Sequence, residues 1–248
     1  MYKKLLITLL LLPSLTRAES TKLMNLDDNS KTYSIDLGAS RIIFNSESDS
    51  YNLPVENKQS YPVLVQSKIM NETSDEKSTR FIVTPPLFRL DAGQKNTVSV
   101  IKTGNIPAGN KESLNWLCVK SIPPTDGSAW VDKNSNSKNS VTVNVMVNSC
   151  IKLILRPSSL DNASTESYGT QLKWEYIKGY LSVRNPTPYV ISFNMIKVNE
   201  RKLTPPTYLM PGDVHTFSNI EIRGGETIRW TLINDYGAPT NEFKYRIK

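Results

Sequence analysis

The sequence predicts an all-β protein built from two sandwiches. Short runs rich in β-branched and aromatic residues recur along the chain, and Gly, Pro, Asn and Asp separate them. Helical periodicity is hard to find. The 248 residues have room for one large domain or two of ordinary size. A break in the β pattern after Arg156 favours two domains.

The first unit is expected to contain seven strands. They follow an irregular polar segment that runs from residue 19 to about residue 31. The expected strands are 33–37, 41–44, 62–70, 80–84, 97–102, 114–122 and 141–155.

The stretch Arg156-Pro157-Ser158-Ser159 interrupts the β pattern, because proline cannot donate to a ladder and small polar residues have no core to join. We therefore expect residues 19–156 to form the first domain and residues 157–248 the second. Alternation resumes at 172–176, 180–185, 190–198, 214–217, 226–234 and 242–247. This spacing predicts a second, smaller sandwich.

Residues 1–18 have the pattern of a secretory signal peptide. Lys3 and Lys4 precede the apolar run 5–12, and Thr16-Arg17-Ala18 offers a small-residue cleavage site. The apolar run is far shorter than the roughly 20 residues of a membrane span. We expect an exported chain that begins at Glu19, without stable membrane insertion.

The charge pattern argues against nucleic acid as a partner. The formal net charge is +7, and removal of Lys3, Lys4 and Arg17 leaves 27 basic against 23 acidic residues, or +4. Basic and acidic residues interleave, with no arginine-rich run or basic helical stripe.

The only two cysteines, Cys118 and Cys150, lie in predicted strands of an exported protein. An oxidising compartment favours their pairing, and two separate buried thiols are the alternative. In the chain-entropy model, closing a loop of about 31 intervening residues contributes roughly 3–4 kcal/mol.

The stretch 140–157 stands out for its alternation. Four valines at period two share one face of an extended chain: Val141, Val143, Val145 and Val147. Polar residues and Met146 occupy the other face, and the polar tract 132–140 precedes the strand. We infer a sheet edge that is not completed within this chain and that a partner strand could extend. The alternative is an ordinary core strand of a sandwich.

Enzyme chemistry finds little support. The only histidine is His215, so a two-histidine metal site cannot form and a Ser-His-Asp triad would depend on this residue. His215 follows a polar turn, which favours a surface or cap position. The chain has no Gly-x-Ser-x-Gly elbow, phosphate-binding loop or Cys-x-x-Cys pair. We expect no enzyme activity, no metal and no cofactor.

Six short motifs occur in order along the chain. They are Ser40-Arg41-Ile42-Ile43-Phe44, Thr84-Pro85-Pro86-Leu87-Phe88-Arg89-Leu90, Glu112-Ser113-Leu114 leading to Ile122-Pro123-Pro124, Cys150-Ile151-Lys152-Leu153-Ile154-Leu155-Arg156-Pro157, Asn185-Pro186-Thr187-Pro188 and Asn234-Asp235-Tyr236-Gly237. With these motifs the mature chain resembles the PapD-like periplasmic chaperones of the chaperone–usher pathway, which escort pilus and surface-fibre subunits.

In three further features the chain resembles the subgroup that has a long loop between strands F1 and G1. This subgroup serves thin fibres and afimbrial or capsule-like adhesins. The three features are the extended N-terminal segment 19–37, the long loop from about 124 to 139, and two cysteines placed to join F1 to G1. Within this subgroup the chain is most similar to capsule-antigen and Afa/Dr-adhesin chaperones.

The resemblance implies two immunoglobulin-like sandwiches in a boomerang arrangement with a cleft between them. Arg41 and Lys152 match the two basic residues that bind the carboxylate at a subunit's C-terminus. Glu112, Arg156 and Asp235 match an interdomain charge network. The donor positions of G1, which fill the groove of a subunit that lacks its last strand, are matched by Val141, Val143, Val145 and Val147. Asn139 departs from the apolar donor pattern.

The resemblance thus implies a periplasmic, non-enzymatic chaperone. It would bind, fold and cap fimbrial or adhesin subunits by donor strand complementation and deliver them to an outer-membrane usher. The alternative is a structural fibre subunit or adhesin that polymerises through the same strand. That alternative is disfavoured, because such subunits usually form one sandwich with an N-terminal donor strand. The exposed edge also predicts weak self-association of the free chaperone.

Overall fold

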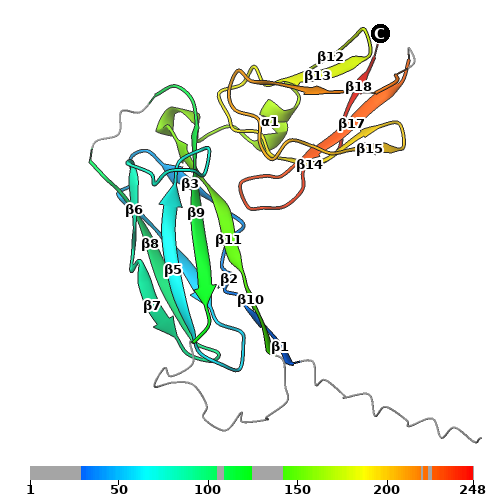
Figure 1. The fold of residues 1–248 in the computed structure, drawn as a ribbon. Coiled ribbons are helices and arrows are strands. Elements are labelled where there is room, and N and C mark those ends of the chain that lie inside the picture. Colours follow the sequence, from blue (N-terminus) through cyan, green and yellow to red (C-terminus); the bar gives the residue numbers. More distant parts are fainter. Residues whose placement is uncertain (1–28, 105–108, 125–141, 219, 223–224, 248) are drawn as a thin grey trace, which may run out of the picture.

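Two β-sandwiches make up the described part of the chain, and the second lies across one end of the elongated first (Figure 1). The computed structural model describes residues 29–104, 109–124, 142–218, 220–222 and 225–247. The expected signal peptide, the polar tract 132–140 and Val141 lie outside these residues. The all-β, two-sandwich fold predicted from the sequence is confirmed.

The first sandwich contains a five-stranded sheet of order β3-β11-β9-β5-β7 and a four-stranded sheet of order β2-β4-β8-β6. A third, two-stranded sheet joins β1 to β10. The strands are β1 (Asn29–Tyr33), β2 (Asp36–Leu37), β3 (Arg41–Asn45), β4 (Ser50–Glu56), β5 (Val63–Met70), β6 (Phe81–Thr84), β7 (Leu87–Leu90), β8 (Lys95–Lys102), β9 (Ser113–Ile122), β10 (Thr142–Met146) and β11 (Asn148–Arg156).

Alternation along the strands builds the first core. In β5, Val63 and Val65 are fully buried, while Gln66 and Lys68 between the inward positions are exposed. Successive strand residues point to opposite faces, so each strand contributes every second side chain to the space between the sheets.

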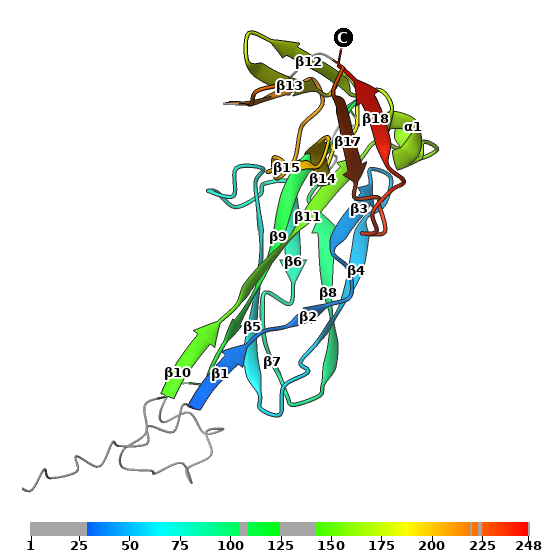
Figure 2. The same ribbon diagram turned by 90° about the vertical axis from the view of Figure 1, so that its right-hand side faces the viewer.

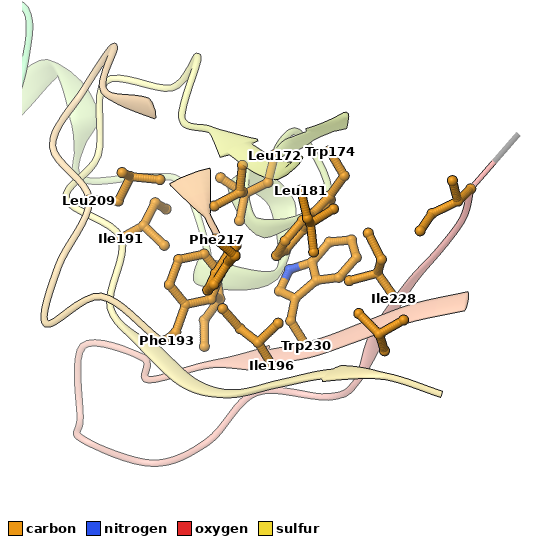
Figure 3. Packing of buried hydrophobic residues seen from close by; sticks show 14 of the residues in the cluster. Leu172, Trp174, Leu181, Ile191, Phe193, Ile196, Leu209, Phe217, Ile228 and Trp230 are labelled. Carbon is orange, nitrogen blue, oxygen red and sulfur yellow. The ribbon is translucent and has the colours of Figure 1, made fainter. Parts of the chain in front are cut away.

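The second sandwich packs a three-stranded sheet of order β12-β13-β16 on a four-stranded sheet of order β15-β14-β17-β18. Its elements are η1 (Ser158–Leu160), α1 (Thr165–Gly169), β12 (Lys173–Ile177), β13 (Tyr180–Arg184), β14 (Phe193–Val198), β15 (Arg201–Leu203), β16 (Val214–Phe217), β17 (Thr227–Leu232) and β18 (Phe243–Arg246). Figure 3 shows the core between the sheets, where Trp174 and Trp230 lie 5.3 Å apart between ring centroids.

Several elements were not expected from the sequence. Strands β4, β7 and β15 and the short helix α1 are new, and β1 lies partly within the segment expected to be irregular. Strand β4 carries Pro54, which argues against a strand because it lacks an N–H group. Its alternation is nonetheless clear, since Leu53 and Val55 are buried.

The expected single strand 141–155 is two strands with different partners. Strand β10 pairs in parallel with β1, and the two run side by side at the far end of the first sandwich (Figure 2). Strand β11 instead lies between β3 and β9 inside a sheet. The prediction of a sheet edge was therefore wrong for β11, which carries Cys150 and Lys152, because β3 covers it.

Strand β11 also reaches the junction between the sandwiches. Leu153 and Leu155 face the first core, whereas Ile154 on the opposite face packs with Leu114 and Val190 in a separate buried cluster. Val190 belongs to the second sandwich, so this cluster joins the two. The domain limits 19–156 and 157–248 stay a prediction.

Candidate functional site

Strand β10 exposes its apolar side chains. Val143 is 49% exposed, Val145 is 45% exposed and Met146 is 52% exposed, although all three lie in a regular strand. A strand of this composition is normally covered, and an uncovered one is a template for pairing. Within the described residues β10 has one ladder partner, β1, so its opposite edge remains available.

Val147 lies at the break between the two strands. Its N–H donates to the carbonyl of Tyr33 at 2.9 Å, and its carbonyl accepts from the N–H of Ser121 at 3.2 Å. The hydroxyl of Ser121 also donates to the Tyr33 carbonyl. These contacts tie the base of β10 to β1 and β9, so the strand projects from a fixed point.

Cys118 and Cys150 form a disulfide. They are directly opposite each other in the antiparallel pair β9–β11. The predicted pairing is confirmed, and it holds β11 to its neighbour two residues before Lys152.

Arg41 and Lys152 are direct partners in the parallel pair β3–β11. Arg41 is 8% exposed, and its Nη1 donates to the carbonyl of Ile233 in the second sandwich at 3.1 Å. Its buried Nε has no hydrogen-bond partner among the described residues. Lys152 is half-buried, so the structure brings the two cations together at a partly dehydrated place, with Arg41 the more buried of the two.

Lys152 makes no ion pair with any described carboxylate. Its Nζ lies 5.6 Å from the ring centroid of Trp116, which is directly opposite on β9. Burial lowers the pKa of Lys152 to about 8, and repulsion from Arg41 adds to the effect. Lys152 therefore carries a positive charge without an ion-pair partner among the described residues and favours an anion, whereas Arg41 beside it is attracted by Asp235 and Glu112.

The junction carries a second charge cluster, in which Arg156 pairs with two carboxylates. Arg156 Nε donates to Glu112 Oε1 at 2.5 Å, and its Nη1 and Nη2 donate to Asp235 at 2.6 and 2.9 Å. The other Glu112 oxygen accepts from the Val190 N–H at 2.6 Å. Glu112 and Arg156 lie in the first sandwich and Asp235 and Val190 in the second, so these bonds join the two.

Burial shapes the electrostatics of this cluster. Burial raises the pKa of Glu112, while Arg156 and the Val190 N–H oppose that rise. Burial by itself would lower the pKa of Arg156. Hydrogen bonds to Asp235 and attraction to Glu112 outweigh it and raise this pKa above the usual value. Asp235 and the Val190 N–H come from the second sandwich, so these hydrogen bonds can fix the orientation of the two sandwiches.

His215 lies in β16 and not in a surface turn. The side chain is half-buried, and burial lowers its pKa. Its ring meets the Phe217 ring edge-on, with 4.6 Å between the ring centroids. The described residues contain no group of His, Cys, Asp or Glu that could hold a metal ion.

Sequence reasoning missed Trp116 and the β1–β10 pair. The disulfide register could have revealed Trp116, because two steps from Cys118 and Cys150 along antiparallel strands bring Trp116 opposite Lys152. No local signal predicts the pairing of β1 with β10, since it joins segments more than 100 residues apart.

The chain belongs to the PapD family of pilus chaperones. Residues 34–161 match "Pili and flagellar-assembly chaperone, PapD N-terminal domain", and residues 167–244 match "Pili assembly chaperone PapD, C-terminal domain". The family predicted from the motifs is confirmed. Its members are chaperones and not enzymes, so this chain is a pilus-assembly chaperone without enzyme activity.

Similar proteins cover nearly the whole chain. Chaperone protein AggD of Escherichia coli is 34% identical over 234 residues, which are 92% of this chain and 91% of that protein. The crystal structure of the E. coli chaperone DraB aligns with a TM-score of 0.74 and 32% identity over 90% of this chain and 100% of DraB.

A third similar protein is the SafB chaperone, solved in complex with the Salmonella enterica SafA pilin. It aligns with a TM-score of 0.75 and 31% identity over 88% of this chain and 100% of that one. Members of the family are periplasmic chaperones. In the described part of this chain, no helix has the length and apolarity needed to cross a membrane.

Proposed function

We propose that this chain is a periplasmic chaperone that captures fimbrial or afimbrial adhesin subunits by donor strand complementation. Strand β10 and Val141 before it would supply the apolar side chains that a subunit lacks. The subunit would remain capped until an outer-membrane usher receives it. Residues 1–18 would direct export and then be removed.

The single observation that carries this proposal is the exposed apolar strand β10. It is followed directly by β11, in which Lys152 makes no ion pair with a described carboxylate. Val143 and Val145 keep about half of their surface exposed. Completing their burial is worth about 1 kcal/mol each, from the roughly 1.5–3 kcal/mol for a full apolar side chain. A partner strand along β10 also satisfies the free backbone groups of its open edge.

Lys152 and Arg41 would bind the C-terminal carboxylate of the subunit. A strand rises about 3.3 Å per residue, so Lys152 and the donor positions are held at a set spacing along the chain. A subunit carboxylate bound at Lys152 would therefore fix which subunit residue meets Val145. Arg41 would act mainly through its charge and its free Nε, because Nη1 already donates to Ile233.

The donor role is tested by Val145→Asp in co-expression with a cognate subunit. A buried carboxylate without a partner costs several kcal/mol, so the recovered complex should fall at least tenfold. The matched control is Ile82→Asp, at an exposed strand position outside β10, which should leave recovery unchanged. Recovery that survives Val145→Asp would make the valine row structural only.

The anchoring role is tested by Lys152→Ala and Arg41→Ala in the same assay. Undiminished recovery of the complex with either variant would refute it. The fibre-subunit alternative is tested with the purified protein alone, which should stay as small soluble species. Filaments formed without a partner would favour the alternative.

A further inference from the structure

A second basic site lies where the two sandwiches meet, outside the residues already assigned. A pocket with a volume of about 480 Å³ is lined by three cations, Lys111, Lys173 and Arg184. Its walls include Pro186, Pro188 and Gly212. We call it the junction pocket.

Among the residues that the structure describes, no acidic side chain lines the junction pocket. Within the described residues, none of its three cations takes part in an ion pair or a side-chain hydrogen bond. Lys173 and Arg184 are also direct partners in the antiparallel pair β12–β13, and like charges in this position repel. An anion between them would remove that repulsion.

Hydrogen bonds hold the walls in place. The side-chain amide of Asn185 donates to the carbonyls of Tyr189, Leu209 and Met210 at 2.7, 3.1 and 3.1 Å. The Gly212 N–H donates to the Asn185 carbonyl at 2.8 Å. The backbone of the pocket walls is therefore preorganised and no loop has to be ordered on binding, while the three cation side chains are exposed.

The first sandwich contributes Lys111 through a fixed contact. The N–H of the next residue, Glu112, donates to the Pro188 carbonyl at 2.8 Å. The Glu112 carboxylate is used by Arg156 and Val190, so it does not neutralise Lys111. The three cations thus meet only while the two sandwiches keep this arrangement.

We propose that the junction pocket binds an acidic segment of a partner protein. Three unpaired cations select negative charge, and the volume lies within the roughly 300–1,000 Å³ of pockets that hold a multi-group ligand. A single carboxylate or phosphate would leave most of it empty. The site is separate from strand β10 and from Lys152, so a captured subunit and an acidic segment can bind together.

The probe is a fluorescein-labelled hexaglutamate peptide, titrated with the full mature chain and followed by fluorescence anisotropy. Arg184→Glu and Lys173→Glu should each raise its Kd at least tenfold, and added salt should weaken binding to the wild type. The matched control is Lys202→Glu. Lys202 also faces a like charge across a strand pair, Lys197, but lies outside the pocket.

Equal weakening by all three substitutions would show an effect of net charge alone and overturn the proposal, as would an absence of binding. Inorganic phosphate that displaces the peptide at the same concentration would reduce the pocket to a small-anion site and also overturn it. If Arg184→Glu misfolds by circular dichroism, Arg184→Gln replaces it, with an expected rise in Kd of about threefold or more.

Amide NMR shifts give an independent reading, since the peptide should move the Gly212 resonance and leave strand β10 unchanged. A shift confined to other residues would contradict the assignment. Subunit capture by Arg184→Glu should equal that of the wild type, so a failure here is distinguishable from a failure of the proposed chaperone function.

Discussion

Capture of a subunit carboxylate should depend on pH with a midpoint set by Lys152. In the free chaperone burial and Arg41 lower the pKa of Lys152 to about 8. A bound carboxylate favours the charged amine, so the pKa of Lys152 must be higher in the complex than in the free protein. Binding at alkaline pH therefore requires proton uptake.

The size of the effect follows from this difference. Affinity is constant below the free pKa and falls about tenfold per pH unit above it, until the pKa of the complex is reached. Between pH 7 and pH 9 the expected loss is about tenfold. A lysine with an ordinary pKa of about 10.4 would lose less than about 5% over the same interval.

The assay is isothermal titration calorimetry with a peptide that spans the last strand of a cognate subunit and ends in a free carboxylate. The same peptide with an amidated terminus is one control, and its weaker binding should not change over this range. The variant Lys152→Arg is the second control, because a guanidinium stays charged and should remove the pH dependence.

The free pKa can also be measured directly by NMR of the lysine side chain next to the amine. A titration midpoint near 10.4, or equal affinities at pH 7 and pH 9, would refute the assignment of Lys152 as a desolvated anchor without a counter-charge.

Four further outcomes follow from the same structure. Lys152→Met should raise Tm by about 2–4 °C at pH 7, because a lowered lysine pKa opposes folding below about pH 8, and the gain should vanish toward pH 10.5. Glu112→Ala should lower the free energy of unfolding by about 3–5 kcal/mol in urea titrations, because Arg156 loses a buried partner. Reduction of Cys118–Cys150 should cost roughly 3–4 kcal/mol by the same measurement. The free chaperone should associate weakly through β10, seen in sedimentation as species larger than a monomer at high concentration.

The matched control for Glu112→Ala is an exposed ion pair. Glu200→Ala removes an exposed partner of Arg229 at 3.9 Å and should cost less than about 1 kcal/mol. A gain in Tm for Lys152→Met that persists at pH 10.5 would place its cause in packing and not in charge. Reduction without loss of stability, or Glu112→Ala with a cost similar to Glu200→Ala, would contradict the buried roles. Only monomer at high concentration would contradict self-association.

Local alternation and the Gly, Pro, Asn and Asp residues between the runs predicted most of the strands, because burial on one face leaves a period of two in the sequence. Strand β4 was not predicted, because Pro54 argued against a strand more strongly than the alternation of Leu53 and Val55 argued for one. The break between β10 and β11 at Val147 was also not predicted, since the alternating valines continue through it. Its cause is a set of hydrogen bonds to Tyr33 and Ser121, which are far away in the sequence.

The motifs named the residues of the site but not their surroundings. Arg41 and Lys152 are neighbours because β3 and β11 pair in parallel, and parallel partners distant in sequence leave no local pattern. The burial of Arg41 depends on the second sandwich, whose Ile233 carbonyl accepts its hydrogen bond. The desolvation that lowers the pKa of Lys152 likewise exists only in the folded chain.

The sequence by itself determined the all-β class, the family and the row of valines, since composition, periodicity and motif order are properties of the chain. Only the tertiary structure decided that β11 is interior while β10 is open, that Lys152 makes no ion pair with any residue that the structure describes, and that three more cations meet at the junction. The physical reason is that exposure, desolvation and charge pairing depend on which distant segments fold against one another.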